Sequence, residues 1–454
     1  MPEFCTIVVG GGASGVLLAS RLVRKSPRAR VTIIEPREAL GRGLAYSTRY
    51  ERHLLNVPAG RMSAFSDDSE HFVRYLRERF GNRYTTSSFA PRPVYGDYLE
   101  AIANEARAFA GARWQHVRAR ALAVSTDDFS VRAICEDGRT YNGDALIVAT
   151  GNAQPAPWIR AHADIVAGER FFPSAWDEGA LICPDRDGDV LLLGTGLTAV
   201  DAVIGLRSNG HRGTIWMVSR RGLLPSEHRF FDAPPDLDPD ATSMNDLLGA
   251  ARTLDRRPHV WRFAMDSLRP RTNALWQALS VDDRRRFVRH ALPFWNIHRH
   301  RMAPEIAEFI AAEIAADRLR MVAGRTGTFA AHANGLRVPI ALRGEDRTIE
   351  LEVGRAINCS GPTHDFRLLD NPLIGNLLEQ GTMQPSELEI GINVAPSGAL
   401  RDAAGAEAER IFTIGPVRFG TLIETTAVPE IRAQAEDLAN LIASRFDLYM
   451  AVAQ

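Results

Sequence analysis

Two stretches of the chain share one order of apolar and polar positions. The stretches are CTIVVGGGASGVLLASRL, near the start, and VLLLGTGLTAVDAV, residues 190–203; each has an apolar run, closely spaced glycines and then helical spacing of apolar residues. This order predicts a buried strand, a tight turn and a helix. We therefore expect two βα units of the kind that build a doubly wound parallel sheet.

The first glycine turn has the spacing of a dinucleotide-binding motif. Gly10, Gly12 and Gly15 allow a tight turn, close approach of a pyrophosphate and packing of the helix on the strand. The next strand, RVTIIEP, ends about 20 residues later in Glu35, which can accept the ribose hydroxyls. Because strand, helix and acid all stand at the expected spacing, a dinucleotide-binding motif is favoured over an ordinary glycine turn. A third strand, GDALIVATG, ends in Gly151. The residues expected to bind this dinucleotide are Gly10, Gly12, Ala13, Ser14, Gly15, Glu35 and Gly151.

The second glycine turn differs in the residues that follow it. Ala199 replaces the third glycine as a small packing residue, and the next strand, GTIWMVSRRG, ends in two arginines instead of an acid. Guanidinium groups bind a 2′-phosphate that an acid would repel, so the motif favours NADP over NAD. A solvated arginine turn remains the alternative. The residues expected to bind this dinucleotide are Gly194, Thr195, Gly196, Thr198, Ser219, Arg220 and Arg221.

Two dinucleotide sites in one chain are typical of flavoproteins that are reduced by a nicotinamide cofactor. One dinucleotide is then held tightly while the other binds and leaves. The acid at Glu35 assigns FAD to the first site, and the arginines assign NADPH to the second.

Composition excludes some partners without naming one. The 454 residues are 45% hydrophobic, which is enough for a large core, and 54 basic against 55 acidic side chains leave a formal charge of −1. No basic field favours nucleic acid or an anionic membrane. No apolar run reaches the length of a membrane span, and no leader precedes the first strand, so we expect a cytoplasmic chain.

Cysteine spacing argues against thiol and metal chemistry. The four cysteines are far apart, without a C-x-x-C pair, and the segment after the first acid, where a redox pair would stand in disulfide reductases, has none. His298 and His300 are two residues apart and would not share a helix face, so no metal site is expected. With Arg299 and Arg301 these histidines form a cationic group, which we interpret as a solvated basic turn rather than an anion site.

Several longer segments resemble a known family. They are GRGLAYST, HLLNVPAGRMS, PRPVYGDYL, LLLGTGLTAVD, SRRGLLP, HRHRMAP and IGPVRFGTLIETTAVPEIR, which span nearly the whole chain. They resemble the bacterial FAD/NAD(P)-binding proteins that include the YdhS-like proteins and are related to flavin-dependent N-hydroxylating monooxygenases. The resemblance implies FAD in the first domain, NADPH in the second, and oxygen activation through a flavin hydroperoxide that hydroxylates a nitrogen. One departure is Gly415-Pro416, where related flavoproteins carry Gly-Asp.

Further residues are candidates for contacts around the flavin. Asn56 is expected to hydrogen-bond a flavin or hydroperoxide oxygen and Arg61 to bind a substrate carboxylate, although both residue types also stabilise loops. Near the carboxyl terminus, a strand, a turn at Gly415 and a helix follow one another. Thr425 or Thr426 is expected to cap that helix, whose positive end would face the flavin pyrimidine edge. Arg92 is expected to contact FAD, and Tyr98 either contacts it or packs in the core.

These patterns predict an α/β fold with two Rossmann-like dinucleotide-binding domains. Residues 1–155 and 330–454 are expected to form a discontinuous FAD domain, and residues 156–329 an NAD(P)H domain with a helical insertion at about 226–320. The favoured function is an NADPH-dependent monooxygenase that uses molecular oxygen to N-hydroxylate a small amine or amino acid. The alternatives are a flavin reductase that passes electrons to a protein or quinone, and a redox-sensing flavoprotein.

Overall fold

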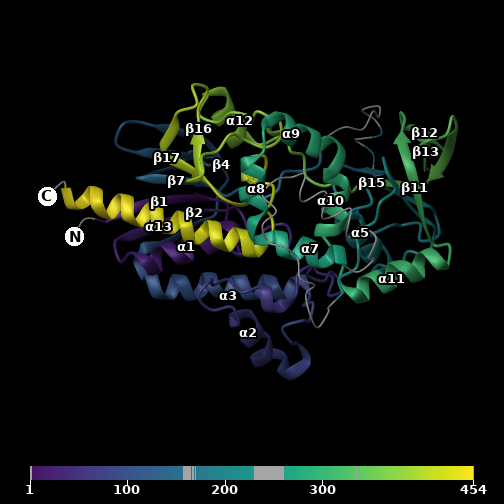
Figure 1. Ribbon diagram of the computed structural model, residues 1–454, viewed down its shortest axis with the longest axis horizontal. Helices are drawn as coiled ribbons and strands as arrows, with labels where there is room; N and C mark the ends of the chain where they lie inside the picture. Colours follow the sequence, from purple (N-terminus) through teal and green to yellow (C-terminus); the bar gives the residue numbers. More distant parts are fainter. Residues whose placement is uncertain are drawn as a thin grey trace. The chain divides into compact units, whose positions relative to one another are not determined.

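The computed structural model describes residues 3–156, 165, 168, 170–229, 260–333 and 335–452 (Figure 1). Two compact units divide the chain, and each has its own mainly parallel sheet flanked by helices, which confirms the predicted α/β class. Unit 1 comprises Met1–Glu51, Val57–Ala153 and His364–Gln454, and unit 2 comprises Arg52–Asn56 and Gln154–Thr363.

The sheet of unit 1 has the strand order β16-β17-β7-β1-β2-β3. The central strand β1 (Phe4–Val9) is parallel to β2 (Ala29–Ile34) and β7 (Ala145–Val148), and Val9 pairs with the last residue of each neighbour. The carboxyl ends of these three strands therefore lie at one edge, where ligands bind in open α/β sheets. The remaining strands of this sheet are β3 (Trp114–Val117), β17 (Glu407–Thr413) and β16 (Ala399–Arg401).

Helices cover the sheet of unit 1 because its strands are apolar on both faces. Helix α1 (Ala13–Lys25) packs against α3 (Arg92–Ala110) and α13 (Val428–Val452), and Figure 1 shows α13 running alongside α1. The buried residues of α1 include Leu18 and Leu22, both without exposed surface. Other elements of the unit are the antiparallel sheet β4 (Ala121–Thr126), β5 (Val131–Cys135) and β6 (Thr140–Gly143), helices α2 (His71–Phe80) and α12 (Pro372–Glu379), and the short turns η1 (Ala59–Arg61), η2 (Gly81–Arg83), η3 (Gly111–Arg113), η6 (Phe366–Leu368) and η7 (Gly415–Arg418).

The sheet of unit 2 repeats this plan. Strand β9 (Val190–Leu193) lies between the parallel strands β10 (Ile215–Ser219) and β15 (Arg355–Asn358), and α5 (Leu197–Ser208) follows it. On the other side of β10 lies the parallel strand β11 (Leu319–Thr326), and beyond β11 the sheet continues into antiparallel strands. The remaining strands are β8 (Phe171–Phe172), β12 (Ala330–His332), β13 (Gly335–Leu342) and β14 (Thr348–Val353).

A segment with several helices separates β10 from β11. Ser280 caps one of its helices by accepting a hydrogen bond from the Asp283 amide at 3.1 Å, which confirms the predicted N-cap. Residues 230–259 of the predicted insertion lie outside the described residues. The helical elements are α7 (Val260–Leu268), η4 (Arg269–Arg271), α8 (Thr272–Ala278), α9 (Val281–Arg286), the π turn η5 (Phe287–Ala291), α10 (Leu292–Arg299) and α11 (Pro304–Ala315). Within the described ranges, no helix is long and apolar enough to cross a membrane.

The boundaries of the units differ from the predicted ones in two places. Residues 330–363 belong to unit 2, because β13 and β14 extend its sheet and β15 pairs with β9. Residues 52–56 also belong to unit 2, although they stand within the sequence of unit 1. His53 anchors this segment, since its ring is buried and its Nε2 lies 2.9 Å from the carbonyl oxygen of Asp201 in α5.

A buried histidine gives unit 2 a pH-dependent stability. The His211 side chain is 3% exposed, and within the described residues neither ring nitrogen has a hydrogen-bond partner. Burial, reinforced by the charge of Arg207, lowers its pKa to about 4. The unfolded histidine, with a pKa near 6.5, takes up a proton that the folded one resists, so stability is lost as the pH falls from about 6.5 towards 4.

We therefore predict that His211 removes about 2 kcal/mol of unfolding free energy between about pH 7.5 and about pH 5. The variant His211→Leu should show a shallower pH dependence than the wild type in urea unfolding followed by circular dichroism. His290 is exposed, so His290→Leu serves as the control and should keep the wild-type slope. Equal slopes for His211→Leu and the wild type would contradict the prediction.

Candidate dinucleotide-binding sites

Two glycines of the first turn are required by the protein itself. Gly10 has φ of +107°, and a Cβ there would lie 2.3 Å from the carbonyl oxygen of Ala149, at the end of β7. A Cβ at Gly15 would lie 2.0 Å from the carbonyl oxygen of Gly10. The tight turn and the close packing of helix on strand predicted for these positions are therefore present.

At Gly12, unlike Gly10 and Gly15, no close contact within the described residues requires a glycine. Its φ of −74° and ψ of −169° suit any residue, and a Cβ there would meet the protein only at 3.4 Å, at Cα of Gly43. Gly12 is the N-cap of α1, and no side chain caps this helix. Backbone amides at an uncapped helix start and open space beside a glycine are what a pyrophosphate requires.

Glu35 and Gly151 lie beside this turn. Glu35 is 7% exposed, and its carboxylate accepts hydrogen bonds from the amides of Gly11 at 2.9 Å and Arg37 at 3.1 Å. A carboxylate has further lone pairs for ribose hydroxyls. Gly151 follows β7 with φ of +75°, and nothing lies within 4 Å of the position of a Cβ. The fold thus brings together the glycine turn, the acid and Gly151.

Gly415 approaches the same turn from the carboxyl-terminal part of the chain. It has φ of +76°, and a Cβ there would lie 2.4 Å from Oγ of Ser14. Gln434 accepts a hydrogen bond from the Gly415 amide at 2.9 Å and donates one to the Thr425 hydroxyl at 3.0 Å. Gly415 and Ser14, far apart in the sequence, are therefore in contact.

The predicted threonine cap of the last helix is wrong for Thr425. Its buried hydroxyl donates to the carbonyl oxygen of Gly415 at 2.6 Å, and α13 begins only at Val428. Thr426 is exposed and lies two residues before Val428, the first residue of α13, so it is not at the cap position either. Thr425 therefore stabilises the Gly415 turn.

Arg92 and Tyr98 both lie on α3. Arg92 is the first residue of the helix and is partly buried. Burial raises the pKa of the nearby Tyr46 to about 12, although the positive charge of Arg92 acts to lower it. Tyr98 has no exposed surface, and its hydroxyl accepts from the Ala64 amide at 3.0 Å and lies 2.8 Å from Nδ1 of His71. Tyr98 thus packs in the core and holds the loop before α2.

The two predicted catalytic residues belong to different units. Asn56 is in the segment that belongs to unit 2, and its carbonyl oxygen accepts a hydrogen bond from Nε2 of His228 at 3.0 Å. Arg61 is in unit 1, exposed, at the end of η1.

The second glycine turn repeats the geometry of the first. Gly194 has φ of +125°, and a Cβ there would lie 2.4 Å from the carbonyl oxygen of Cys359, at the end of β15. Gly196 has φ of −80°, and no atom of the described residues lies within 4 Å of the position of its Cβ. Ala199 is fully buried, and Gly196 begins α5 without a side-chain cap. The space beside Gly196 is therefore open, like the space beside Gly12 in the first turn. Thr198 is partly buried in the first turn of α5.

The hydroxyls of Thr195 and Ser219 fix the end of β10. The Thr195 hydroxyl donates to the carbonyl oxygen of Leu223 at 2.6 Å and lies 3.0 Å from Oγ of Ser219. Ser219 accepts a further hydrogen bond from the Gly222 amide at 2.9 Å. These contacts hold the two arginines of the turn beside the second glycine motif. Arg220 is exposed, and the guanidinium of Arg221 lies 5.4 Å from the ring centroid of Phe294 in α10.

The segment HRHRMAP is not the solvated turn expected from the sequence. Arg299 is 7% and Arg301 3% exposed. Arg301 pairs with Asp266, and its guanidinium lies 6.0 Å from the centroid of Trp261. The segment therefore packs α10 against α7, which explains why its charges are buried.

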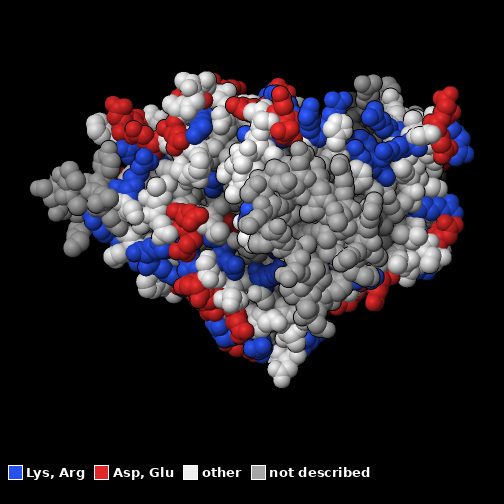
Figure 2. Space-filling view, viewed as in Figure 1, with Lys and Arg blue, Asp and Glu red and all other residues white. Residues whose placement is uncertain are grey.

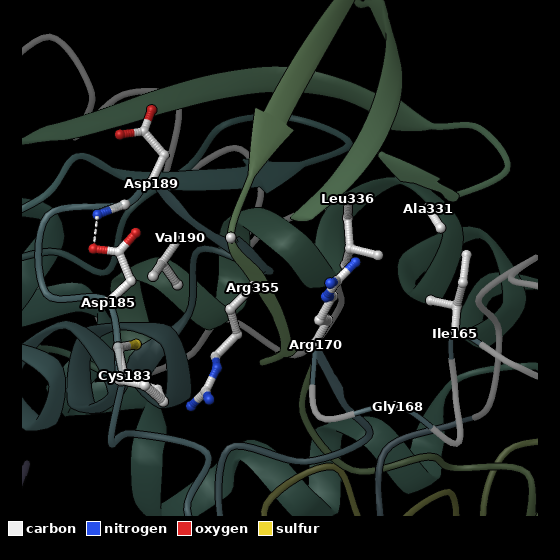
Figure 3. A pocket seen from close by; sticks show the side chains of 13 residues that line it. Ile165, Gly168, Arg170, Cys183, Asp185, Asp189, Val190, Ala331, Leu336 and Arg355 are labelled. Atoms are coloured by element: carbon white, nitrogen blue, oxygen red, sulfur yellow. Dashed lines mark hydrogen bonds between the residues drawn. The ribbon is translucent and has the colours of Figure 1, made fainter. Parts of the chain in front are cut away.

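A large cavity lies away from the glycine turn of unit 2. Its volume is about 650 Å³, and it is lined at the amino ends of β9 and β15 by Val190 and Arg355 (Figure 3). Its charged groups are already used by the protein, since Nη1 of Arg355 donates to three backbone carbonyls and Asp185 accepts from the Gly188 amide at 3.1 Å. We do not assign the reaction to this cavity, because nucleotides bind at the opposite edge of such sheets.

Charges of both signs lie on the surface (Figure 2), and no cysteine forms a disulfide. Acidic and basic side chains are interspersed over the face in Figure 2. All four cysteines are free, and burial raises the pKa of each thiol. Such thiols are poor nucleophiles, which argues against dithiol chemistry. Among the described side chains, no group of three or more His, Cys, Asp or Glu residues is placed to hold a metal ion.

The fold and the two glycine turns define an α/β protein with two dinucleotide-binding units. Residues 7–153 match the family model for FAD-NAD(P)-binding proteins, which agrees with the glycine motif predicted in this segment. A segment of 159 residues, 32% of this chain, is 28% identical to the 3-dehydro-bile acid delta(4,6)-reductase of Clostridium scindens. The match covers only 38% of that reductase.

Solved structures share the fold over nearly the whole chain. The ornithine N-hydroxylase KtzI of Kutzneria sp. 744, solved with reduced FAD, NADP+ and L-ornithine, has a TM-score of 0.66 at 16% identity, covering 98% of this chain and 100% of its own. The cadaverine monooxygenase DfoA of Erwinia amylovora, bound to FAD, has a TM-score of 0.69 at 13% identity, with coverage of 98% and 95%. The thioredoxin reductase of Lactococcus lactis has a lower TM-score of 0.56 at 12% identity, with coverage of 98% and 100%.

Four contacts at these sites were not predicted from the sequence. Gly43 contacts Gly12, Gln434 accepts a hydrogen bond from Gly415, His228 donates one to Asn56, and the ring of Phe294 contacts Arg221. Only Gly43, in GRGLAYST, stands in a segment whose glycines signal a close approach of backbones.

The open position at Gly12 gives a direct test of cofactor binding. The Cβ of Gly12→Ala would make only an ordinary contact with the protein, so the variant should fold but bind FAD at least about tenfold more weakly. Gly15→Ala is the matched control, and its Cβ clash should lower the stability of the apoprotein by about 1–3 kcal/mol. Flavin absorbance and thermal unfolding measure the two effects. Full FAD occupancy in Gly12→Ala would refute this role of Gly12.

Proposed function

We propose that the chain is an NADPH-dependent FAD monooxygenase that N-hydroxylates a small amine or amino acid. In the overall reaction, NADPH, a proton, molecular oxygen and the amine give NADP+, water and the hydroxylamine. The observation that carries the proposal is the pair of open glycine turns, at Gly12 and Gly196, in a chain whose four cysteines form no disulfide and have thiol pKa values raised by burial.

In this proposal unit 1 holds FAD. The amides at the start of α1 bind the pyrophosphate beside Gly12, and Glu35 accepts the ribose hydroxyls. Bound FAD supplies a hydride acceptor and a means of activating oxygen. The other residues proposed to line the FAD site are Gly10, Ala13, Ser14, Gly15, Arg92, Gly151, Gly415, Thr425 and Thr426. The uncapped helix start and the contact of Gly415 with Ser14 support this assignment.

NADPH is proposed to bind unit 2. Its pyrophosphate would lie at the open position of Gly196, at the uncapped start of α5 with Thr198, and its adenosine end at the turn of Arg220 and Arg221. Gly194, Thr195 and Ser219 shape this site through their backbone and hydroxyl contacts. Support comes from the absence of an acid at the end of β10 and from the exposure of Arg220.

Two residues are proposed to act on the substrate. Asn56 would donate a hydrogen bond to a developing negative oxygen, and Arg61 would bind a carboxylate of the substrate. The hydrogen bond from His228 to the Asn56 backbone supports the first role, because it restricts the backbone that carries the amide. The exposure of Arg61 supports the second.

The second candidate is an NADPH-dependent flavin reductase that passes electrons to a protein or quinone. The similarity of 159 residues to a bile acid reductase favours it. Both candidates use the same two dinucleotides and differ in the fate of the electrons.

The test follows oxygen. The FAD-loaded protein is reduced with NADPH, oxygen is admitted, and peroxide and products are measured with a panel of amines and amino acids. We expect one compound to suppress peroxide and to gain a single oxygen atom that is labelled when ¹⁸O₂ is used. Rapid reduction of quinones or dyes with no oxygenated product from any amine would support the reductase and contradict the monooxygenase.

A further inference from the structure

The two arginines after β10 have different surroundings. The Arg221 guanidinium carbon lies 5.4 Å from the ring centroid of Phe294, within the range of a cation–π contact, and Arg221 is partly buried. Phe294 itself is 45% exposed although it is a large apolar residue. The stacked pair therefore borders solvent next to the second glycine turn.

Arg220 stands apart from this contact. It is exposed, and no ion pair or ring contact of its guanidinium is found among the described residues. Thr195 and Ser219 hold the backbone between β10 and Leu223, and this fixes the turn that carries both arginines. One guanidinium therefore contacts an aromatic ring, whereas the other forms no ion pair or ring contact with a described side chain and is exposed, so that an anion can reach it.

We propose, building on the NADPH site above, that the two arginines have separate tasks. Arg221, supported by Phe294, forms a flat platform for the adenine ring, which NADPH and NADH share. Arg220 alone binds the 2′-phosphate and sets the preference for NADPH. Phe294 is therefore a positioning residue contributed by the helical insertion.

The chemistry of the guanidinium supports this division. A guanidinium is planar and stacks on aromatic faces, so a group with one face on Phe294 still offers its other face to a base. A 2′-phosphate instead needs N–H groups directed at its oxygens in charge-assisted hydrogen bonds. An exposed, unstacked arginine reorients freely to provide them.

The test measures the affinity of the FAD-loaded protein for NADP+ and NAD+ by titration calorimetry. In Arg220→Ala the Kd for NADP+ should rise about tenfold or more, while that for NAD+ stays within about twofold. In Arg221→Ala and Phe294→Ala both Kd values should rise by a similar factor, about threefold. Phe294→Tyr keeps the aromatic face and should retain wild-type affinity for both nucleotides.

Other outcomes overturn the division. A loss of NADP+ affinity in Arg221→Ala that exceeds the loss for NAD+ as strongly as in Arg220→Ala would assign the phosphate to both arginines. Unchanged affinity in Phe294→Ala would remove the platform. Flavin content and circular dichroism identify a variant that fails to fold. A wild-type protein that binds neither nucleotide would refute the NADPH site itself, which is a different result from any of these.

Discussion

One backbone contact recurs in both units, and the candidate sites depend on it. The first glycine of each turn lies against the carbonyl oxygen that ends a neighbouring parallel strand. A Cβ would be 2.3 Å from Ala149 at Gly10 and 2.4 Å from Cys359 at Gly194. The contact leaves no room for a side chain, so the chain turns sharply into the helix. Its amides then face the edge of the sheet where nucleotides bind.

The same comparison separates structural glycines from those that serve a ligand. Gly12 and Gly196 have backbone angles that suit any residue, and among the described residues a Cβ would make only an ordinary contact with Gly43 at Gly12 and no contact at Gly196. The space beside each of them is open to a ligand, as the proposed dinucleotide sites require. Downstream of each turn the units diverge, because unit 1 presents the buried carboxylate of Glu35 and unit 2 presents arginines. That divergence gives the two units different nucleotides in the proposed function.

Local motifs were enough to predict the fold class, both glycine turns and the Ser280 cap, since each depends on a few adjacent residues. The boundary at residue 330 was not predictable in this way. Strand β15, followed by Cys359 and Gly361, resembles β7, followed by Ala149 and Gly151, because each lies beside a strand that leads into a glycine turn. However, β15 belongs to unit 2 and β7 to unit 1. The burial of the HRHRMAP arginines and the use of Thr425 to hold Gly415 likewise depend on partners far away in the sequence.

The central claim is that the chain has two dinucleotide-binding sites, one in each unit, and the variant Gly196→Val tests it most directly. The backbone angles at Gly196 suit a branched residue, and no described atom lies within 4 Å of its Cβ position. FAD released per chain and NADP+ bound per chain are measured in the variant and the wild type. We predict one FAD and one NADP+ per wild-type chain, and a variant that keeps FAD but loses NADP+. A variant that still binds NADP+ with wild-type affinity, or that loses FAD, would contradict the claim.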